Sequence, residues 1–198
     1  MNNNLKTLRT LLIMSALLLA GIASALLLRP SPAGQALGTR LGGDFNLMSA
    51  EGPTTLANFR GYPSILYFGY TACPDVCPTS LAIMAQGFRS LSPDEQSRVR
   101  GIFVSVDPKR DTPESLAAYS AFFHPSLVGL TGSEAQIDTI TKRYGAYYHI
   151  SEQTDSALGY TVDHSSRLYL IDSDGQLLEV LSDSINPDEL AAKLRALL

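Results

Sequence analysis

The chain has 198 residues, of which 45% are hydrophobic and 17% are charged, and it contains two cysteines and no tryptophan. A chain of this length is expected to form one domain with a sizeable core. Residues 1–30 hold three of the 15 basic residues and no acidic residue, so the remainder carries 12 basic and 19 acidic residues, a net charge of −7. This acidic remainder argues against a nucleic-acid-binding protein, which needs a basic surface. Two cysteines are also too few for a disulfide scaffold or a four-cysteine zinc site.

The first segment in chain order is an apolar run at residues 10–28, flanked by Lys6 and Arg9 before it and by Arg29 after it. As a helix this run would be about 28 Å long, close to the ~30 Å hydrocarbon core of a bilayer. Its basic N-terminal flank favours a cytoplasmic N-terminus and a translocated remainder. A cleaved signal peptide is the alternative, because Ala-Ser-Ala at residues 23–25 is typical of a cleavage site. The apolar run continues past that site, which favours an uncleaved anchor.

We therefore expect three parts in the chain. Residues 1–30 form a cytoplasmic N-terminus and a transmembrane anchor. Residues 31–43, which are rich in glycine and in small or polar residues, form a flexible tether. Residues 44–198 form a folded domain outside the cytoplasm, where thiols oxidise unless a reductant acts on them.

The folded part alternates between strand-like and helix-like segments. Short apolar runs at residues 65–68 and 102–106 are typical of central parallel strands. Apolar side chains at helical spacing form three stripes: Leu81, Met84, Phe88 and Leu91; Leu116, Tyr119 and Phe123; and Ile137, Ile140 and Tyr144. Residues 167–172 and 176–181 flank a Ser-Asp-Gly turn and predict a hairpin, which a last helix follows.

Four helix starts are marked by capping residues, at Ser92, Thr112, Ser133 and Asn186. With these boundaries, the order is strand, helix, strand, helix, a further helix, a hairpin and a final helix. This order predicts an α/β fold, a thioredoxin-like sandwich of three layers.

Both cysteines, Cys73 and Cys77, lie between the first apolar strand and the helix that follows it. A cysteine at a helix N-terminus is exposed to partial positive charge, which lowers its pKa and favours the thiolate. A separation of four residues brings two sulfurs to the same side of a helical turn. There they can close a disulfide or, when reduced, hold one soft metal ion.

Three interpretations of the cysteine pair compete. A structural disulfide would close a loop so short that its entropic stabilisation is slight. A thiol–disulfide oxidoreductase suits the position at a strand-to-helix junction, although thioredoxins separate their cysteines by two residues rather than three. A metal site requires at least one further ligand. A peroxidase of the peroxiredoxin class is disfavoured, because Leu66 and Tyr70 stand where that family places a proline and a Thr or Ser.

Three histidines are candidates for the further ligand. His124 lies at a predicted helix end and His149 in a predicted strand, and we expect both to be structural or surface residues. His164 lies in a polar loop before an apolar strand, and in a thioredoxin-like fold this loop faces the start of the first helix. We therefore predict His164 as the third ligand, with Asp163 as a candidate carboxylate partner. Two thiolates and one imidazole suit copper, whereas a structural zinc site needs four ligands.

These residues resemble the Sco (SenC/PrrC-like) family of copper-binding proteins that assemble cytochrome c oxidase. The likeness covers residues 41–198 and is carried by three ordered motifs. They read YFGYTACPDVCP at residues 67–78, VSVDPKRDTP at residues 104–113 and VDHS at residues 162–165. The second motif is assigned no chemistry, since a turn and a helix cap account for it. Ala72 departs from relatives that carry a bulkier or polar residue there, which puts affinity or redox poise in doubt but not the ligand set.

The resemblance implies a single-pass protein of the inner membrane with its domain in the periplasm. It implies copper, as Cu(I) or Cu(II), bound by Cys73, Cys77 and His164 for delivery to the binuclear copper centre of the oxidase subunit. An upstream copper donor and a thiol reductant are further implied partners. On this hypothesis the protein binds and transfers a metal rather than turning over a substrate. The alternative is a periplasmic thiol–disulfide reductase that uses Cys73 and Cys77 on the oxidase subunit or other disulfides.

Overall fold

The computed structural model describes residues 9, 13–15, 18, 41–152 and 159–198. Apart from these few N-terminal positions, the predicted anchor at residues 1–30 lies outside the described residues, as does the predicted tether up to residue 40. Among the described residues, no helix combines the length and the apolar character that a membrane span requires. The last residues of the predicted tether are described and lie against the end of a helix, where the Gly42 N–H donates to the Arg143 carbonyl at 2.9 Å.

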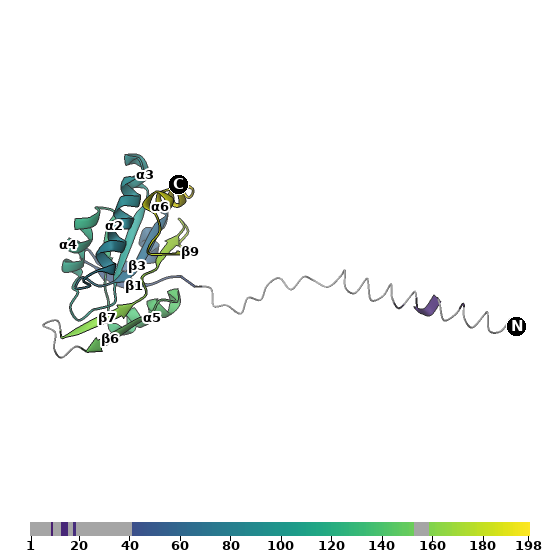
Figure 1. Ribbon diagram of the computed structural model, residues 1–198, viewed down its shortest axis with the longest axis horizontal. Helices are drawn as coiled ribbons and strands as arrows, with labels where there is room; N and C mark the ends of the chain where they lie inside the picture. The colour runs from purple at the N-terminus through teal and green to yellow at the C-terminus, as the bar shows by residue number, and fades with distance from the viewer. Residues whose placement is uncertain (1–8, 10–12, 16–17, 19–40, 153–158) are drawn as a thin grey trace. The chain divides into compact units, whose positions relative to one another are not determined.

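A five-stranded sheet forms the centre of the unit Arg40–Leu198 (Figure 1). In spatial order its strands are β5 (Leu127–Leu130), β4 (Arg100–Ser105), β3 (Ser64–Gly69), β8 (Leu168–Ile171) and β9 (Leu177–Leu181). The first three run parallel to one another, and β8 and β9 are antiparallel to their neighbours. Every residue of β3 is buried, as expected for an apolar strand covered on both faces. The predicted parallel strands and the predicted hairpin are therefore confirmed.

Helices cover both faces of this sheet. Tyr67 and Phe103 are cross-strand partners on one face, and Tyr119 of α4 (Pro113–Phe123) packs against Phe103 there. Phe68 faces the opposite side of the sheet, because successive strand residues alternate, and it packs against Tyr144 of α5 (Glu134–Tyr144). The other α-helices described in residues 41–198 are α2 (Val76–Arg89), α3 (Pro93–Ser97) and α6 (Pro187–Arg195). The result is the mixed α/β fold with a central sheet that the element order predicted.

The predicted helix starts are also confirmed. Ser92, Thr112 and Ser133 each accept a hydrogen bond from a backbone N–H of the first turn and complete a capping box. Asn186 accepts from the Asp188 N–H at 2.8 Å. These contacts are local, which is why the sequence pattern alone reveals them.

Four features were not predicted: an N-terminal hairpin, a short 3₁₀ helix, strand β5, and the extension of one predicted strand into a second hairpin. Besides β5, they comprise β1 (Asn46–Ser49), β2 (Gly52–Thr55), η1 (Leu56–Phe59), β6 (Tyr148–Glu152) and β7 (Tyr160–His164). The prediction that His164 lies in a loop is wrong, because it is the last residue of β7, opposite Tyr148 of β6. Only Val162 of β7 is buried, so the strand carries no apolar run that would have marked it.

Candidate metal centre

The cysteines are positioned by the junction between β3 and α2. Cys73 lies in the loop after Gly69, the last residue of β3, and Cys77 lies in the first turn of α2. A Cβ atom at Gly69 would come within 2.7 Å of the Cys77 sulfur and 2.9 Å of the Tyr67 ring. The junction therefore requires glycine, because any larger residue would push the start of α2 away from the strand.

The structure brings the three predicted residues together. Cys73 Sγ, Cys77 Sγ and a ring nitrogen of His164 all lie within 4.8 Å of one another. The Cys77 sulfur is 3.2 Å from His164 Nε2, and the Cys77 backbone N–H donates to the Cys73 sulfur at 3.4 Å. Both cysteines are free thiols, with Cys73 8% exposed and Cys77 fully buried. Two sulfurs and one imidazole nitrogen at this spacing form a donor set that suits one soft metal ion.

The His164 ring is oriented by contacts on its far side. Its Nδ1 is 3.1 Å from the Ser165 carbonyl oxygen, and because that oxygen can only accept, Nδ1 is assigned the proton. Nε2 then faces the sulfurs and is the ring nitrogen that a metal would bind. The rings of Tyr67 and Tyr70 meet the imidazole edge-on, with centroids 6.1 Å and 5.7 Å away.

The predicted carboxylate partner of the imidazole is wrong. The Asp163 carboxylate accepts a hydrogen bond from the Ser151 hydroxyl across the β6–β7 hairpin, at 3.0 Å. Adjacent strand residues point to opposite faces, so Asp163 and His164 cannot share one side of β7. A backbone carbonyl, that of Ser165, takes the role that the sequence suggested for Asp163.

The two thiols differ in acidity. A hydrogen bond from the Cys77 thiol is the largest influence on Cys73, and together with the His164 side chain and the backbone N–H groups of Asp75 and Cys77 it outweighs burial and lowers the Cys73 pKa to about 3. The Cys77 pKa is raised, because its thiol donates to Cys73 and because it is buried. The pair therefore retains one proton, on Cys77, and presents a thiolate at Cys73.

The site opens to solvent through a depression of about 360 Å³. Its lining consists of Tyr70, Cys73, Pro74, Asp75, Val76, Thr161, Val162, Asp163 and His164. Cys73 and His164 lie at this opening, whereas Cys77 is fully buried behind them. A depression of about 570 Å³ between β1 and α5 contains neither sulfur nor imidazole, so size alone does not identify the candidate centre.

The other two histidines lie elsewhere, as expected. His124 caps the C-terminus of α4, is buried, and accepts the Ser126 backbone N–H at Nδ1 over 3.1 Å. Its ring meets Phe88 edge-on, and burial lowers its pKa. His149 is exposed on β6. Neither residue belongs to the group around the sulfurs.

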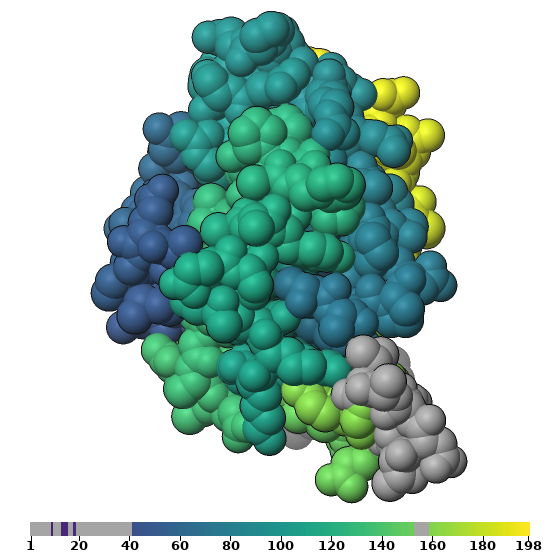
Figure 2. All heavy atoms as spheres, turned by 90° about the vertical axis from the view of Figure 1, so that its left-hand side faces the viewer, coloured from purple at the N-terminus to yellow at the C-terminus, as the bar shows by residue number. Residues whose placement is uncertain are grey.

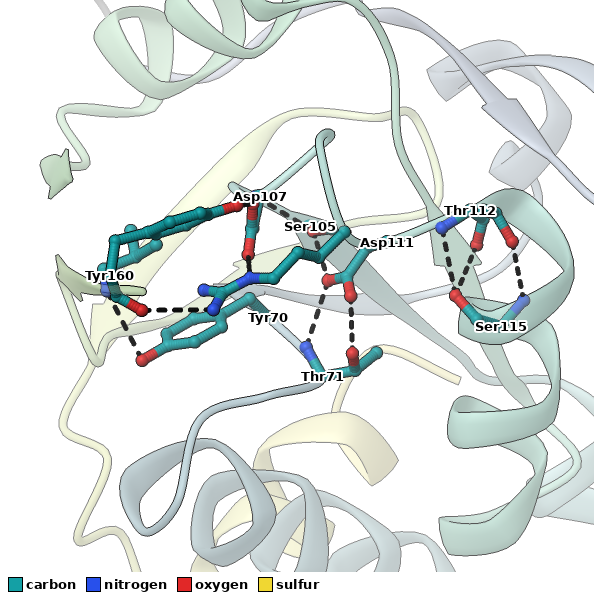
Figure 3. Close-up of polar contacts among 10 residues, drawn as sticks. Tyr70, Thr71, Ser105, Asp107, Asp111, Thr112, Ser115 and Tyr160 are labelled. Carbon is teal, nitrogen blue, oxygen red and sulfur yellow. Dashed lines mark hydrogen bonds and ion pairs between the residues drawn. The ribbon is translucent and has the colours of Figure 1, made fainter. Parts of the chain in front are cut away.

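One set of supporting residues was not predicted from the sequence. The Asp111 carboxylate accepts from the backbone N–H and the hydroxyl of Thr71, at 3.0 Å and 2.5 Å, and from the Ser105 hydroxyl at 2.6 Å (Figure 3). Thr71 lies in the cysteine loop, so a residue 40 positions away holds that loop in place. A signal was present, because β3 and β4 are parallel neighbours and the loops after them must meet at one sheet edge.

Known proteins are similar to this chain in sequence and in fold. The sequence profile described as SCO1/SenC matches residues 33–198. The mitochondrial protein SCO2 of Saccharomyces cerevisiae is 38% identical over 156 residues, which cover 78% of this chain and 52% of that protein. The chain thus spans about half the length of this relative. An SCO2-like protein of Rickettsia felis is 38% identical over 157 residues, 79% of this chain and 76% of that protein.

Among solved structures, Bradyrhizobium japonicum ScoI with copper bound has a TM-score of 0.72 and 38% sequence identity. The alignment covers 80% of this chain and 99% of that chain. The similarity therefore extends over nearly the whole of a protein that was solved with copper.

Proposed function

This chain belongs to the SCO1/SenC family, and we propose that it binds one copper ion through Cys73, Cys77 and His164. We further propose that it delivers this copper to the binuclear copper centre of cytochrome c oxidase during assembly. The observation that carries the proposal is the convergence of two sulfurs and one imidazole nitrogen within 4.8 Å. Thiolate sulfur favours Cu(I), and imidazole accepts both copper oxidation states. The similar ScoI of Bradyrhizobium japonicum, solved with copper, supports the choice of metal.

The geometry suits a cargo that is passed on rather than kept. Three ligands leave copper without the closed coordination of a structural site. Cys73 and His164 line the opening, so a ligand of the acceptor protein can approach the metal before these two residues release it. Cys77 is fully buried and would be the last ligand to separate. A tether to the inner membrane, with the domain in the periplasm, would place this opening beside a membrane-embedded acceptor.

A second function, thiol–disulfide reduction, is favoured by the unequal acidity of the two cysteines. The low pKa of Cys73 makes it a nucleophile near neutral pH, whereas Cys77 keeps its proton. Cys73 would attack a target disulfide and release one target thiolate, and Cys77 would then displace the second to form a Cys73–Cys77 disulfide. The pair supplies two electrons to the target, and a periplasmic thiol reductant restores it. Because this disulfide removes both thiolate ligands, reduction and copper binding exclude each other.

Anaerobic Cu(I) titration of the reduced full-length protein in detergent, against a chromophoric competitor, tests the first function. We expect one copper per chain with sulfur ligation, and His164→Ala should weaken affinity at least about 100-fold. His149→Ala is the matched control, because it removes an exposed imidazole from the same hairpin, and it should leave affinity unchanged. Equal affinity in all three proteins would contradict the proposed ligand set. Reduction of a model disulfide that survives in His164→Ala would support the second function.

A further inference from the structure

The turn between β4 and α4 contacts the histidine-bearing hairpin as well as the cysteine loop. The Arg110 guanidinium forms an ion pair with the buried Asp107 carboxylate and donates to the Tyr160 carbonyl oxygen at 3.1 Å. It also lies over the Tyr160 ring, 3.8 Å from the centroid. The Tyr160 hydroxyl donates to the other Asp107 oxygen at 2.7 Å (Figure 3). Asp107, Arg110 and Tyr160 thus form a closed set of contacts, which we call the hairpin brace.

The hairpin brace is built as a rigid contact. Asp107 is fully buried and the Arg110 side chain is only 23% exposed, so the ion pair is poorly screened by water. Hydrogen bonds between charged groups are shorter and stronger than neutral ones. A planar guanidinium can pair with a carboxylate and stack on an aromatic ring at the same time, which a lysine ammonium cannot.

The hairpin that receives this contact needs it. β6 and β7 form a separate two-stranded sheet and do not join the central sheet. Figure 2 shows the green to light-green hairpin at the lower end of the unit. A two-stranded ribbon is marginally stable by itself and depends on tertiary contacts. Further polar contacts join it to the rest of the domain: the Tyr148 hydroxyl on β6 donates to Asp138 of α5 at 2.6 Å, and the Val162 backbone N–H on β7 donates to the Tyr70 hydroxyl at 3.5 Å.

We propose that Arg110 is a positioning residue for His164. By holding Tyr160, the first residue of β7, it keeps the last residue of that strand 3.2 Å from the Cys77 sulfur. Tyr160 and His164 are four residues apart, about 13 Å along an extended strand. A displacement of Tyr160 at one end of the strand would therefore also displace His164 at the other end. The same turn holds the cysteine loop through Asp111 and Thr71. The cysteine loop and the histidine-bearing hairpin, which together form the candidate metal centre, therefore both contact residues 107–111.

The inference rests on the proposed copper site, and a double-mutant cycle tests it. Arg110→Ala should weaken Cu(I) affinity about tenfold, the order expected when a residue that orients a ligand is lost. In a His164→Ala background the same substitution should have no effect, because there is no imidazole left to position. Lys109→Ala is the matched control, since Lys109 is exposed and pairs with Glu134 instead, and it should keep full affinity in both backgrounds.

A second measurement needs no copper. Hydrogen exchange of the backbone amides at residues 160–164 should accelerate in metal-free Arg110→Ala, whereas exchange in α6 should not change. Arg110→Lys keeps a charge beside Asp107 but loses the planar fork and the stacking, so it should show a smaller change in the same direction. If Arg110→Ala does not fold, Arg110→Lys still tests whether Arg110 holds the hairpin.

Two results would overturn the inference: an affinity loss of equal size in both backgrounds, or unchanged exchange at residues 160–164 in both Arg110 variants. An unchanged affinity in His164→Ala alone would instead count against the proposed copper site. In that case the exchange measurement still decides whether Arg110 holds the hairpin.

Discussion

Two consecutive strand-to-helix loops at the same edge of the sheet have opposite designs. The loop between β3 and α2 carries Cys73, and the N-cap residue of α2, Asp75, makes no side-chain capping bond. The loop between β4 and α4 ends in Thr112, whose side chain accepts the Ser115 N–H in a full capping box. At the start of α2 a backbone N–H group therefore donates to a cysteine sulfur, whereas at the start of α4 a backbone N–H group donates to the capping side chain.

The difference separates chemistry from support. In the cysteine loop the Cys77 N–H donates to the Cys73 sulfur, which stabilises a thiolate there. In the second loop the charged side chains Asp107, Arg110 and Asp111 turn away from their own helix and contact distant segments. One loop presents reactive groups and its neighbour fixes their positions. Substitutions in the first loop should therefore change mainly copper affinity, and substitutions in the second should change mainly the free energy of unfolding.

The largest effect is expected at the buried sulfur. Cys77→Ser replaces a soft ligand with a hydroxyl oxygen, which Cu(I) binds poorly. Competition titration should show a loss of Cu(I) affinity of at least about 100-fold. Because the two side chains are similar in size, the thermal unfolding midpoint of the metal-free protein should change little. Retained affinity would show that copper is held by other residues.

The next effect concerns the support given by the second loop. Asp111→Ala removes the acceptor of three hydrogen bonds and leaves Ser105 and Thr71 without their partner. We expect unfolding to become easier by about 3 kcal/mol, measured by urea denaturation of the metal-free protein. Asp111→Asn keeps part of the acceptor capacity and should cost less. Glu114→Gln, an exposed change on α4, is the control, and an equal effect there would refute the role of Asp111.

Substitutions at the two helix caps should have smaller effects on stability, and the two effects should differ. Thr112→Ala should destabilise the metal-free protein by about 1 kcal/mol, because a capping hydroxyl is lost. Asp75→Ala should change the free energy of unfolding by less than about 0.5 kcal/mol, since this side chain makes no capping bond. Thr112→Ala should leave Cu(I) affinity unchanged. Equal destabilisation by both substitutions would remove the distinction between the two helix starts.

The smallest change is a pH dependence that is nearly absent. With a pKa of about 3, Cys73 is already a thiolate throughout the range from about pH 5 to pH 8, so its alkylation rate should vary less than about twofold. A thiol of ordinary pKa would react about tenfold faster for each unit of pH in this range. Iodoacetamide labelling with mass-spectrometric identification of the modified cysteine distinguishes the two. Steep pH dependence at Cys73 would contradict the thiolate assignment.

Much of the site was visible in the sequence, because the relevant signals are local. The position of Cys73 and Cys77 after an apolar strand and before a helical stripe predicted their place at the mouth of α2. The choice of His164 among three histidines depended on its position relative to β8, and the structure places it beside the sulfurs. The strand that carries it was not predicted, since β7 has a single buried residue and gains its partner from β6.

The sequence alone was enough to predict the two central parallel strands β3 and β4, the helices with their caps, and the grouping of two cysteines at one helix start. Periodicity, capping and turn chemistry act over a few residues and are therefore readable along the chain. The contacts of Asp111 with the cysteine loop and of Arg110 with the histidine hairpin, across 40 and 50 residues of sequence, became visible in the folded structure. The Asp111 contact exists because β3 and β4 pair in parallel and bring the ends of both strands to one edge of the sheet, and the Arg110 contact exists because the separate β6–β7 hairpin packs against the same turn. No local pattern records such an arrangement, which arises only when the strands pack together.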